Sequence, residues 1–167
     1  FDIISLVPSC VLMFKQELPL LFSENEALKE IKNRIYDPFE YLVMREKGDL
    51  LKKDFQKSLG KIAYQISCHQ RVQNIGPVTK NILEMIPDTE VETIERCSGH
   101  DGTYALKKET YNNSKKIVNR VVKKVDSTQA DYLTSDCPLA GEHIKNFSTI
   151  KLDNVHPISL LRKAYNL

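Results

Sequence analysis

Short apolar runs alternate with helical patterns along the chain, and this alternation limits the possible folds more than any other feature. Runs with the length of a strand occupy residues 2–7, 61–66, 91–95 and 130–135. Helical patterns occupy residues 11–22, 24–37, 37–48, 77–86, 104–125, 141–147 and 156–165. Strands that alternate with helices are typical of a mostly parallel sheet flanked by helices, so the sequence predicts an α/β fold.

Proline and glycine residues mark where several of these helices begin or end. Pro38 and Pro77 stand in a first helical turn, where proline is tolerated because the first amide groups have no partner within the helix. Gly48 marks the end of a helix. Pro19 lies inside the first helical pattern, where we expect it to kink or end the helix.

Composition and charge are those of a globular protein. Of the 167 residues, 41% are hydrophobic and 28% charged, and the formal net charge is +2. The small charge, without aromatic residues along a basic stripe, argues against nucleic-acid binding. No apolar stretch approaches the roughly 18 residues of a membrane span, and no secretory leader is evident. Because Phe1 already belongs to a strand pattern, we expect this chain to be a piece of a longer protein.

Four cysteines carry the clearest chemical signal, because each follows one strand pattern. They are Cys10, Cys68, Cys97 and Cys137. The loops after parallel strands lie at one sheet edge, where such folds bind ligands, so we expect the four thiols to gather there. The wide spacing and the lack of a C-x-x-C pair exclude zinc-finger and simple ferredoxin patterns. Thiolates suit iron–sulfur clusters and zinc about equally, and the alternative for any of them is a small buried core residue.

The loop around Cys97, in the stretch IERCSGHDGTYALKKE, combines this thiol with turn-forming residues. Gly99 and Gly102 are expected to let backbone N–H groups approach a bound group. His100, and His69 beside Cys68, are each expected either to ligate a metal or hydrogen-bond a cluster sulfur, or simply to bond to the loop backbone.

A weak internal similarity suggests two related halves. DIISLVPSC near the start and DYLTSDCPLAG near the end each run from Asp through an apolar strand to a proline. The turns V-P-S-C and C-P-L-A resemble two degenerate forms of C-P-x-C. We therefore expect residues 1–59 to hold the tail of a first cysteine-rich repeat with a helical connection. Residues 60–167 would form the second repeat, within one compact domain overall.

Four segments also carry a resemblance to a known family. They are PSCVLMFKQELPLL, SCHQRVQNIG, ERCSGHDGTYALKKE and SDCPLAGEHI. In this order they resemble the cysteine-rich (CCG-domain) iron–sulfur oxidoreductases. That family includes the B-type subunits of heterodisulfide reductase and the C-type subunits of anaerobic glycerol-3-phosphate dehydrogenase. The chain is most similar to the glycerol-3-phosphate dehydrogenase type.

The resemblance implies that the four cysteines are metal ligands. Cys68 matches the family's proline-Cys-His element, and Cys97 matches its C-C-G element. Cys137 matches the C-P-x-C element, and Cys10 matches the last cysteine of the preceding repeat. Three further cysteine positions of the family hold Val7, Ser98 and Ala140 here. The remaining thiols imply a four-iron (4Fe-4S) cluster, a more labile cluster, or another metal, with zinc as the alternative.

The resemblance also implies a function. The chain is expected to belong to an electron-transfer subunit of an oxidoreductase that passes electrons from a flavoprotein dehydrogenase to a quinone or carrier. Its expected partners are the dehydrogenase subunit or a ferredoxin-like module, with no nucleic acid. The expected location is the cytoplasm, peripheral to the membrane through partners alone. The alternatives are a non-catalytic assembly module with structural zinc or no metal, and a thiol/disulfide enzyme that uses Cys68 and Cys97.

Overall fold

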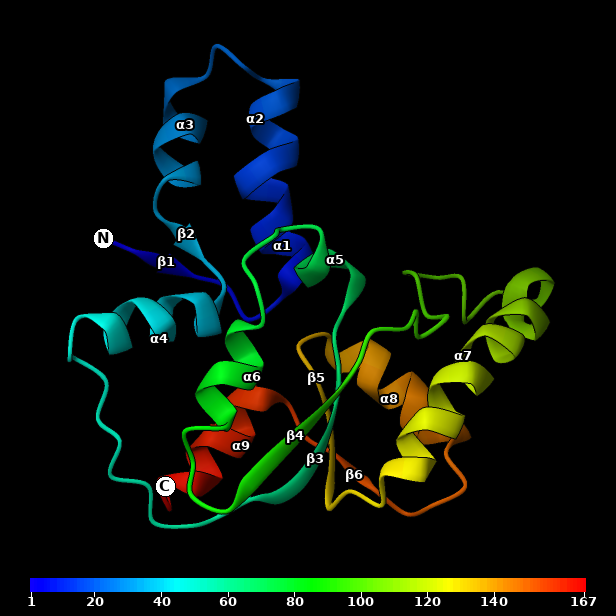
Figure 1. Cartoon of the computed structure of the whole chain (residues 1–167). Coiled ribbons are helices and arrows are strands. Elements are labelled where there is room, and N and C mark those ends of the chain that lie inside the picture. Colours follow the sequence, from blue (N-terminus) through cyan, green and yellow to red (C-terminus); the bar gives the residue numbers. More distant parts are fainter. The chain divides into compact units, whose positions relative to one another are not determined.

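The chain builds two units in four alternating segments. In the computed structural model, which describes residues 1–167, the first unit comprises Phe1–Lys52 and Cys68–Ile82. The second unit comprises Lys53–Ser67 and Leu83–Leu167. Figure 1 labels the helices and strands of both units. The division of the chain into two repeats at residue 60 stays a prediction.

The second unit contains a four-stranded sheet in which all neighbouring strands are parallel. Its strands are β3 (Gly60–Gln65), β4 (Thr89–Ile94), β5 (Tyr132–Ser135) and β6 (Asp153–Asn154). They lie in the order β4-β3-β5-β6. The three longer strands occupy three of the strand patterns in the sequence, and the predicted α/β architecture with parallel strands is confirmed.

The three longer strands end level with one another. Gln65, the last residue of β3, pairs with Ile94 at the end of β4 and with Ser135 at the end of β5. The segments that follow β3, β4 and β5 therefore leave the same edge of the sheet, which is the usual ligand-binding edge of parallel sheets.

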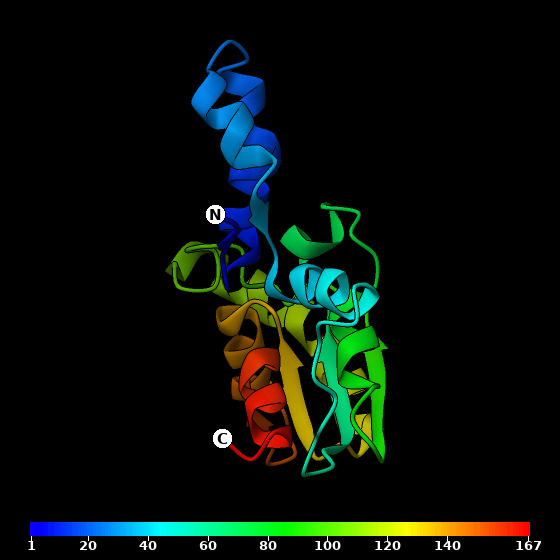
Figure 2. The same cartoon turned by 90° about the vertical axis from the view of Figure 1, so that its left-hand side faces the viewer.

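Helices cover both faces of this sheet (Figures 1 and 2). One face is covered by α7 (Lys108–Thr128) and α8 (Pro138–Phe147), and the other by α9 (Pro157–Ala164). The apolar stripe of α7 is buried against Ala63, Ile94 and Leu133 of the strands. Burial of this stripe is the main reason for a helix here, since packing contributes more to helix stability than propensity does. None of the helices combines the length and apolar character needed to cross a membrane.

The first unit contains a separate two-stranded parallel sheet. Its strands, β1 (Ile3–Ile4) and β2 (Ile35–Tyr36), pair with each other alone. The sequence predicts a longer first strand at 2–7 within the main sheet, and this prediction is wrong. The prediction of a helix throughout 24–37 is also wrong, because α3 (Glu26–Lys32) ends before β2.

The remaining elements of the first unit are helical. The helix from Pro8 runs as α1 (Pro8–Leu12), the π-helix η1 (Met13–Glu17) and α2 (Leu18–Leu21). Pro19 lacks an amide hydrogen and its ring crowds the preceding turn, and the wider π turn before it accommodates both effects. Three further helices follow: α4 (Pro38–Lys47), α5 (Cys68–Arg71) and α6 (Val78–Leu83).

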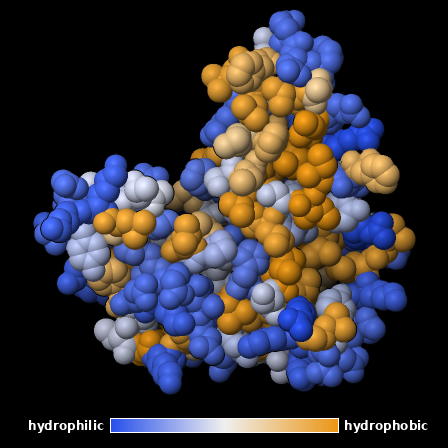
Figure 3. All heavy atoms as spheres, turned by 180° about the vertical axis from the view of Figure 1, so that it is seen from behind, coloured by the Kyte–Doolittle hydropathy of each residue, from blue (hydrophilic) through white to orange (hydrophobic).

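The first unit has a well-capped helix but a small core. Asp37 caps α4 by accepting hydrogen bonds from the amides of Phe39 and Glu40, while the Glu40 side chain accepts one from the amide of Asp37. By contrast, many apolar side chains of the N-terminal helix stay exposed, and hydrophobic atoms gather over this unit in Figure 3. The exposed set includes Met13, Leu20 and Leu21, and Phe22 directly after the helix. The core of the first unit is correspondingly small.

In the second unit, Asp126 fastens the end of α7 to the segment after α8. Its carboxylate accepts hydrogen bonds from the Ser148 hydroxyl at 2.6 Å, the Thr149 amide at 3.1 Å and the Thr149 hydroxyl at 2.5 Å. Burial on its own raises the pKa of Asp126, but the hydrogen bonds from Ser148 and Thr149 outweigh burial and lower this pKa.

Asp126→Asn is expected to lower the free energy of unfolding by about 1 kcal/mol at neutral pH, because an amide group cannot accept all three hydrogen bonds. A carboxyl group whose pKa is lower in the folded state stabilises the fold at pH values above its unfolded pKa. This stabilisation is lost as the pH falls through the folded pKa. The difference in unfolding free energy between the parent chain and Asp126→Asn should therefore shrink below about pH 4. Urea unfolding across this range measures it, and a difference that does not change with pH would contradict the assignment.

Candidate functional site

None of the four cysteines forms a disulfide. Cys10 lies in α1, and Cys68 is the first residue of α5, three positions after β3. Cys97 follows β4 by three residues, and Cys137 precedes α8 as its N-cap, two residues after β5. Cys137 is half-buried and the other three are exposed.

The cysteines divide equally between the two units. Cys10 and Cys68 belong to the first unit, and Cys97 and Cys137 belong to the second. The sequence predicts four thiols at the edge of one sheet. Cys68, Cys97 and Cys137 follow adjacent strands of the main sheet, but Cys10 follows β1, which belongs to the two-stranded sheet. The single-sheet placement of Cys10 is therefore corrected.

In the second unit, a buried glutamine connects the segments that carry Cys97 and Cys137. The Nε2 group of Gln65 donates to the carbonyl of Arg96 at 2.9 Å and to that of Ile66 at 2.8 Å. The Oε1 atom of Gln65 accepts from the Ser135 hydroxyl at 2.8 Å. Ser135 Oγ also accepts from the amide of Cys137 at 3.3 Å. Gln65 therefore reaches Arg96, directly before Cys97, and through Ser135 reaches Cys137.

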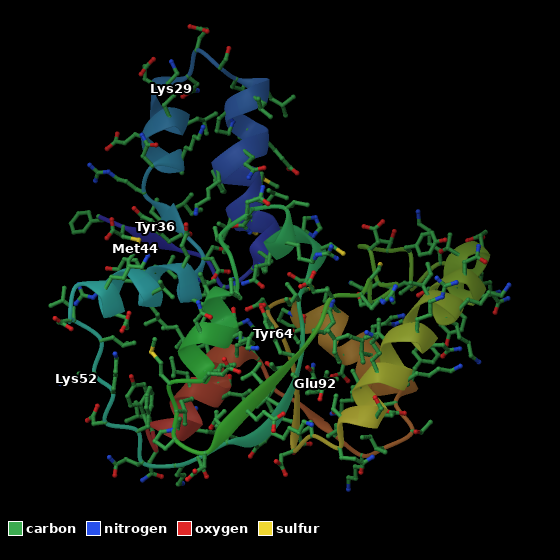
Figure 4. The ribbon with its side chains drawn as sticks, viewed as in Figure 1. Lys29, Tyr36, Met44, Lys52, Tyr64 and Glu92 are labelled. Atoms are coloured by element: carbon green, nitrogen blue, oxygen red, sulfur yellow. The ribbon has the colours of Figure 1, made fainter.

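A second buried contact lies beside this glutamine. The hydroxyl of Tyr64, which Figure 4 labels on β3, donates to the carboxylate of Asp136. Tyr64 and Asp136 are both almost fully buried. Because buried polar groups are costly unless paired, this contact fixes the residue that directly precedes Cys137.

The Cys97 loop is held by a tight turn at Gly99. The amide of Gly99 donates to Cys97 Sγ at 3.4 Å, and Gly99 has a left-handed φ of 73°. A Cβ at this position would lie 2.7 Å from the backbone oxygen of Ser114 in α7. Gly102 also has positive φ, 55°, but a Cβ there would meet no atom within 4 Å. The turn is therefore packed at Gly99 and open at Gly102.

Ser114 and His143 support this turn from two helices. Ser114 Oγ lies 2.7 Å from the carbonyl oxygen of Gly99 and 2.9 Å from His143 Nε2. Since a carbonyl can only accept, the serine proton goes to Gly99 and His143 Nε2–H donates to Ser114. Burial lowers the pKa of His143, and neighbouring His100 lowers it further. Ser114 is fully buried, so this pair holds the loop and is no hydrolase nucleophile.

The first unit has a comparable glutamine. The Nε2 group of Gln73 donates to the carbonyl of Pro8 at 3.1 Å and to that of His69 at 3.0 Å. Pro8 begins α1, which carries Cys10, and His69 follows Cys68 in α5. The imidazole of His69 is on an exposed residue, whereas His100 is half-buried with its ring 6.1 Å from that of His143.

The donor chemistry fits a thiolate-bound metal centre. Four cysteines outside disulfides are present, and two buried polar atoms of residues close to Cys68 in the sequence have no hydrogen-bond partner: Ser67 Oγ and Gln73 Oε1. Unpaired buried polar atoms are uncommon and often mark a place where a bound group or water is accommodated. Within each unit, however, no three His, Cys, Asp or Glu side chains are gathered to hold a metal ion. The ligand roles of the four cysteines, His69 and His100 therefore stay predictions.

The sequence interpretation missed the residues that hold these loops. Gln65 and Ser135 end apolar strand runs, and polar residues at such positions are a signal of a hydrogen-bonded sheet edge. Ser114 interrupts a run of Lys and Asn residues before the apolar stripe of α7, and gives no comparable signal. Gln73 also lies in a polar stretch, so the sequence alone does not single it out.

Comparison with known proteins gives two consistent matches. The family model described as a cysteine-rich domain (CCG) matches residues 62–145, about half of the chain. The chain is also 30% identical over 105 residues to the C-type subunit of anaerobic glycerol-3-phosphate dehydrogenase from Escherichia coli K12. The same protein of E. coli O157:H7 matches equally. The match covers 62% of this chain but only 26% of these relatives, so the chain spans about a quarter of their length.

Proposed function

This chain belongs to the cysteine-rich (CCG) domain family, and from that premise we propose that it is part of an electron-transfer subunit of an oxidoreductase. Its proposed cofactor is an iron–sulfur cluster of the four-iron type. The proposal is carried by one observation: Cys68, Cys97 and Cys137 lie within the residues that the family model matches, and each follows one of three adjacent parallel strands.

The proposed ligands are Cys10, Cys68, Cys97 and Cys137, with His69 and His100 as further candidates. A bound cluster would supply one-electron transfer, and its potential would depend on burial and on hydrogen bonds to sulfur. The Gly99 amide, 3.4 Å from Cys97 Sγ, is one such donor. Amides and dipoles near a thiolate also offset its negative charge.

The proposed partners follow from the similarity to a dehydrogenase subunit. Electrons would come from a flavoprotein dehydrogenase subunit, directly or through a ferredoxin-like module, and pass to a quinone or carrier. Contact with the membrane would be made through these partners. The substrate of the complete enzyme would be selected by the dehydrogenase subunit.

Metal analysis of protein purified under strict anaerobiosis tests the proposal. We expect iron and acid-labile sulfide in equal amounts and an EPR signal on reduction. Cys97→Ser and Cys137→Ser are each expected to lose most of the iron, because thiolate ligands hold such clusters. Ser127→Ala, at an exposed position of α7, is the control that should keep the iron.

Zinc without iron in this experiment would favour the alternative, a non-catalytic assembly module. The resemblance implies that Ser98 and Ala140 replace family cysteines, and such a loss would favour this alternative, since zinc sites need only four ligands. Both residues are buried, Ser98 beside Cys97 and Ala140 within α8. Protein without either metal after anaerobic reconstitution would contradict both proposals.

A further inference from the structure

We propose that two buried glutamines, Gln65 and Gln73, are positioning residues, each of which fixes two cysteine-bearing segments of its own unit against each other. Gln65 does so for the segments of Cys97 and Cys137, and Gln73 for those of Cys10 and Cys68. That the positioned thiols bind a metal rests on the proposed function. The bridging itself does not.

Gln73 connects two helices that are far apart in the sequence. Its amide nitrogen donates one proton to the Pro8 carbonyl in the first turn of α1 and the other to the His69 carbonyl in α5. The residue is buried, with 8% of its surface exposed. Both protons of the amide are therefore used, and the hydrogen bond to the Pro8 carbonyl is buried.

Gln65 makes the corresponding connection at the edge of the sheet. Its two protons go to the carbonyls of Ile66 and Arg96, and its oxygen accepts the Ser135 proton. Only 1% of this residue is exposed. The chain from Gln65 through Ser135 ends at the amide of Cys137, so one side chain links the segments that leave β4 and β5.

Only an amide of this length has the required chemistry. Glutamate offers no proton to a carbonyl, methionine has the same length without any donor, and asparagine is shorter by one methylene. Substitution with methionine removes two hydrogen bonds to backbone carbonyls in each unit, while the packing volume changes little. Gln65→Met and Gln73→Met are therefore matched variants that remove the bridge and keep the shape.

Amide hydrogen exchange, measured by mass spectrometry on the full chain without metal, tests the two variants against each other. Each variant should affect the cysteine segments of its own unit and leave those of the other unit unchanged. For Gln73→Met we expect roughly tenfold faster exchange in residues 8–12 and 68–72, as expected when a segment loses buried hydrogen bonds, with residues 95–99 and 135–140 unchanged. For Gln65→Met we expect the reverse pattern. Ile82→Val removes one core methyl group from the first unit, and Ile144→Val removes one from the second. Neither variant should selectively accelerate amide exchange in the segments of either cysteine pair.

Cadmium, a thiophilic metal used alone, separates positioning from a merely structural role. In a titration followed by thiolate-to-cadmium absorption, each glutamine variant should bind cadmium about tenfold more weakly, whereas Ile82→Val and Ile144→Val should bind like the parent chain. Equal exchange in all segments, faster exchange in only one segment of a pair, or unchanged cadmium affinity would overturn the proposal. Failure of the parent chain to incorporate iron, with the crossed exchange pattern intact, would instead defeat the proposed function.

Discussion

Gly99→Ala is expected to destabilise the second unit by roughly 3 kcal/mol, because left-handed backbone strain and overpacking add together. The φ of Gly99 is 73°, which L-residues with a side chain adopt at a cost. The new Cβ would also lie 2.7 Å from the backbone oxygen of Ser114 and 3.3 Å from the amide of Val118. Neither atom can move without distorting α7, whose inner face is part of the core.

Gly102→Ala is the matched control for this change. It lies in the same loop and also has positive φ, but nothing lies within 4 Å of the added Cβ. We expect it to cost about 1 kcal/mol, the strain alone. Denaturant unfolding of both variants gives the difference, which measures the packing of the turn against α7. Equal costs for the two variants would show that the Cys97 loop is not held against this helix.

The longer strands of the main sheet could be predicted because burial leaves a local pattern in each of them. β3 and β5 are mostly buried, whereas the edge strand β4 alternates, with Val91 buried between the exposed Glu90 and Glu92. The strands β1, β2 and β6 have two residues each, too few for any periodicity. Ile35 and Tyr36 continue the helical spacing of α3 in the sequence, and only pairing with β1 makes them a strand.

The candidate site could be predicted in part for a related physical reason. Parallel strands with helical crossovers place the segments after β3, β4 and β5 at one edge, so the relation of Cys97 and Cys137 to that edge follows from the alternation alone. The side chains that hold these segments depend on contacts between distant residues. Gln65 bonds to Ser135, 70 positions away, and Ser114 bonds to Gly99, 15 positions away. No local pattern records such partners.

Truncation of a core side chain in β5, the strand that precedes Cys137, should destabilise the second unit about as much as Gly99→Ala does. Leu133→Ala is expected to lower the free energy of unfolding by about 3 kcal/mol, the usual cost of a cavity in a well-packed core. Leu133 has no exposed surface, and it lies on β5 among the apolar residues of α7 and α8. Because β5 is hydrogen-bonded to β3 and β6, the strand cannot easily move to fill the space.

Leu139→Ala makes the same chemical change at a position that is 62% exposed, in the first turn of α8. This control should change the stability by less than about 0.5 kcal/mol, since little apolar surface is uncovered and alanine favours a helix. The pair also tests how Cys137 is supported, because the cysteine lies between the two leucines. If packing around Leu133 holds the segment that carries Cys137, Leu133→Ala should speed amide exchange at residues 135–140 and Leu139→Ala should not. Similar exchange in both variants would mean that the segment is held by Gln65, Ser135 and Asp136 without help from the core.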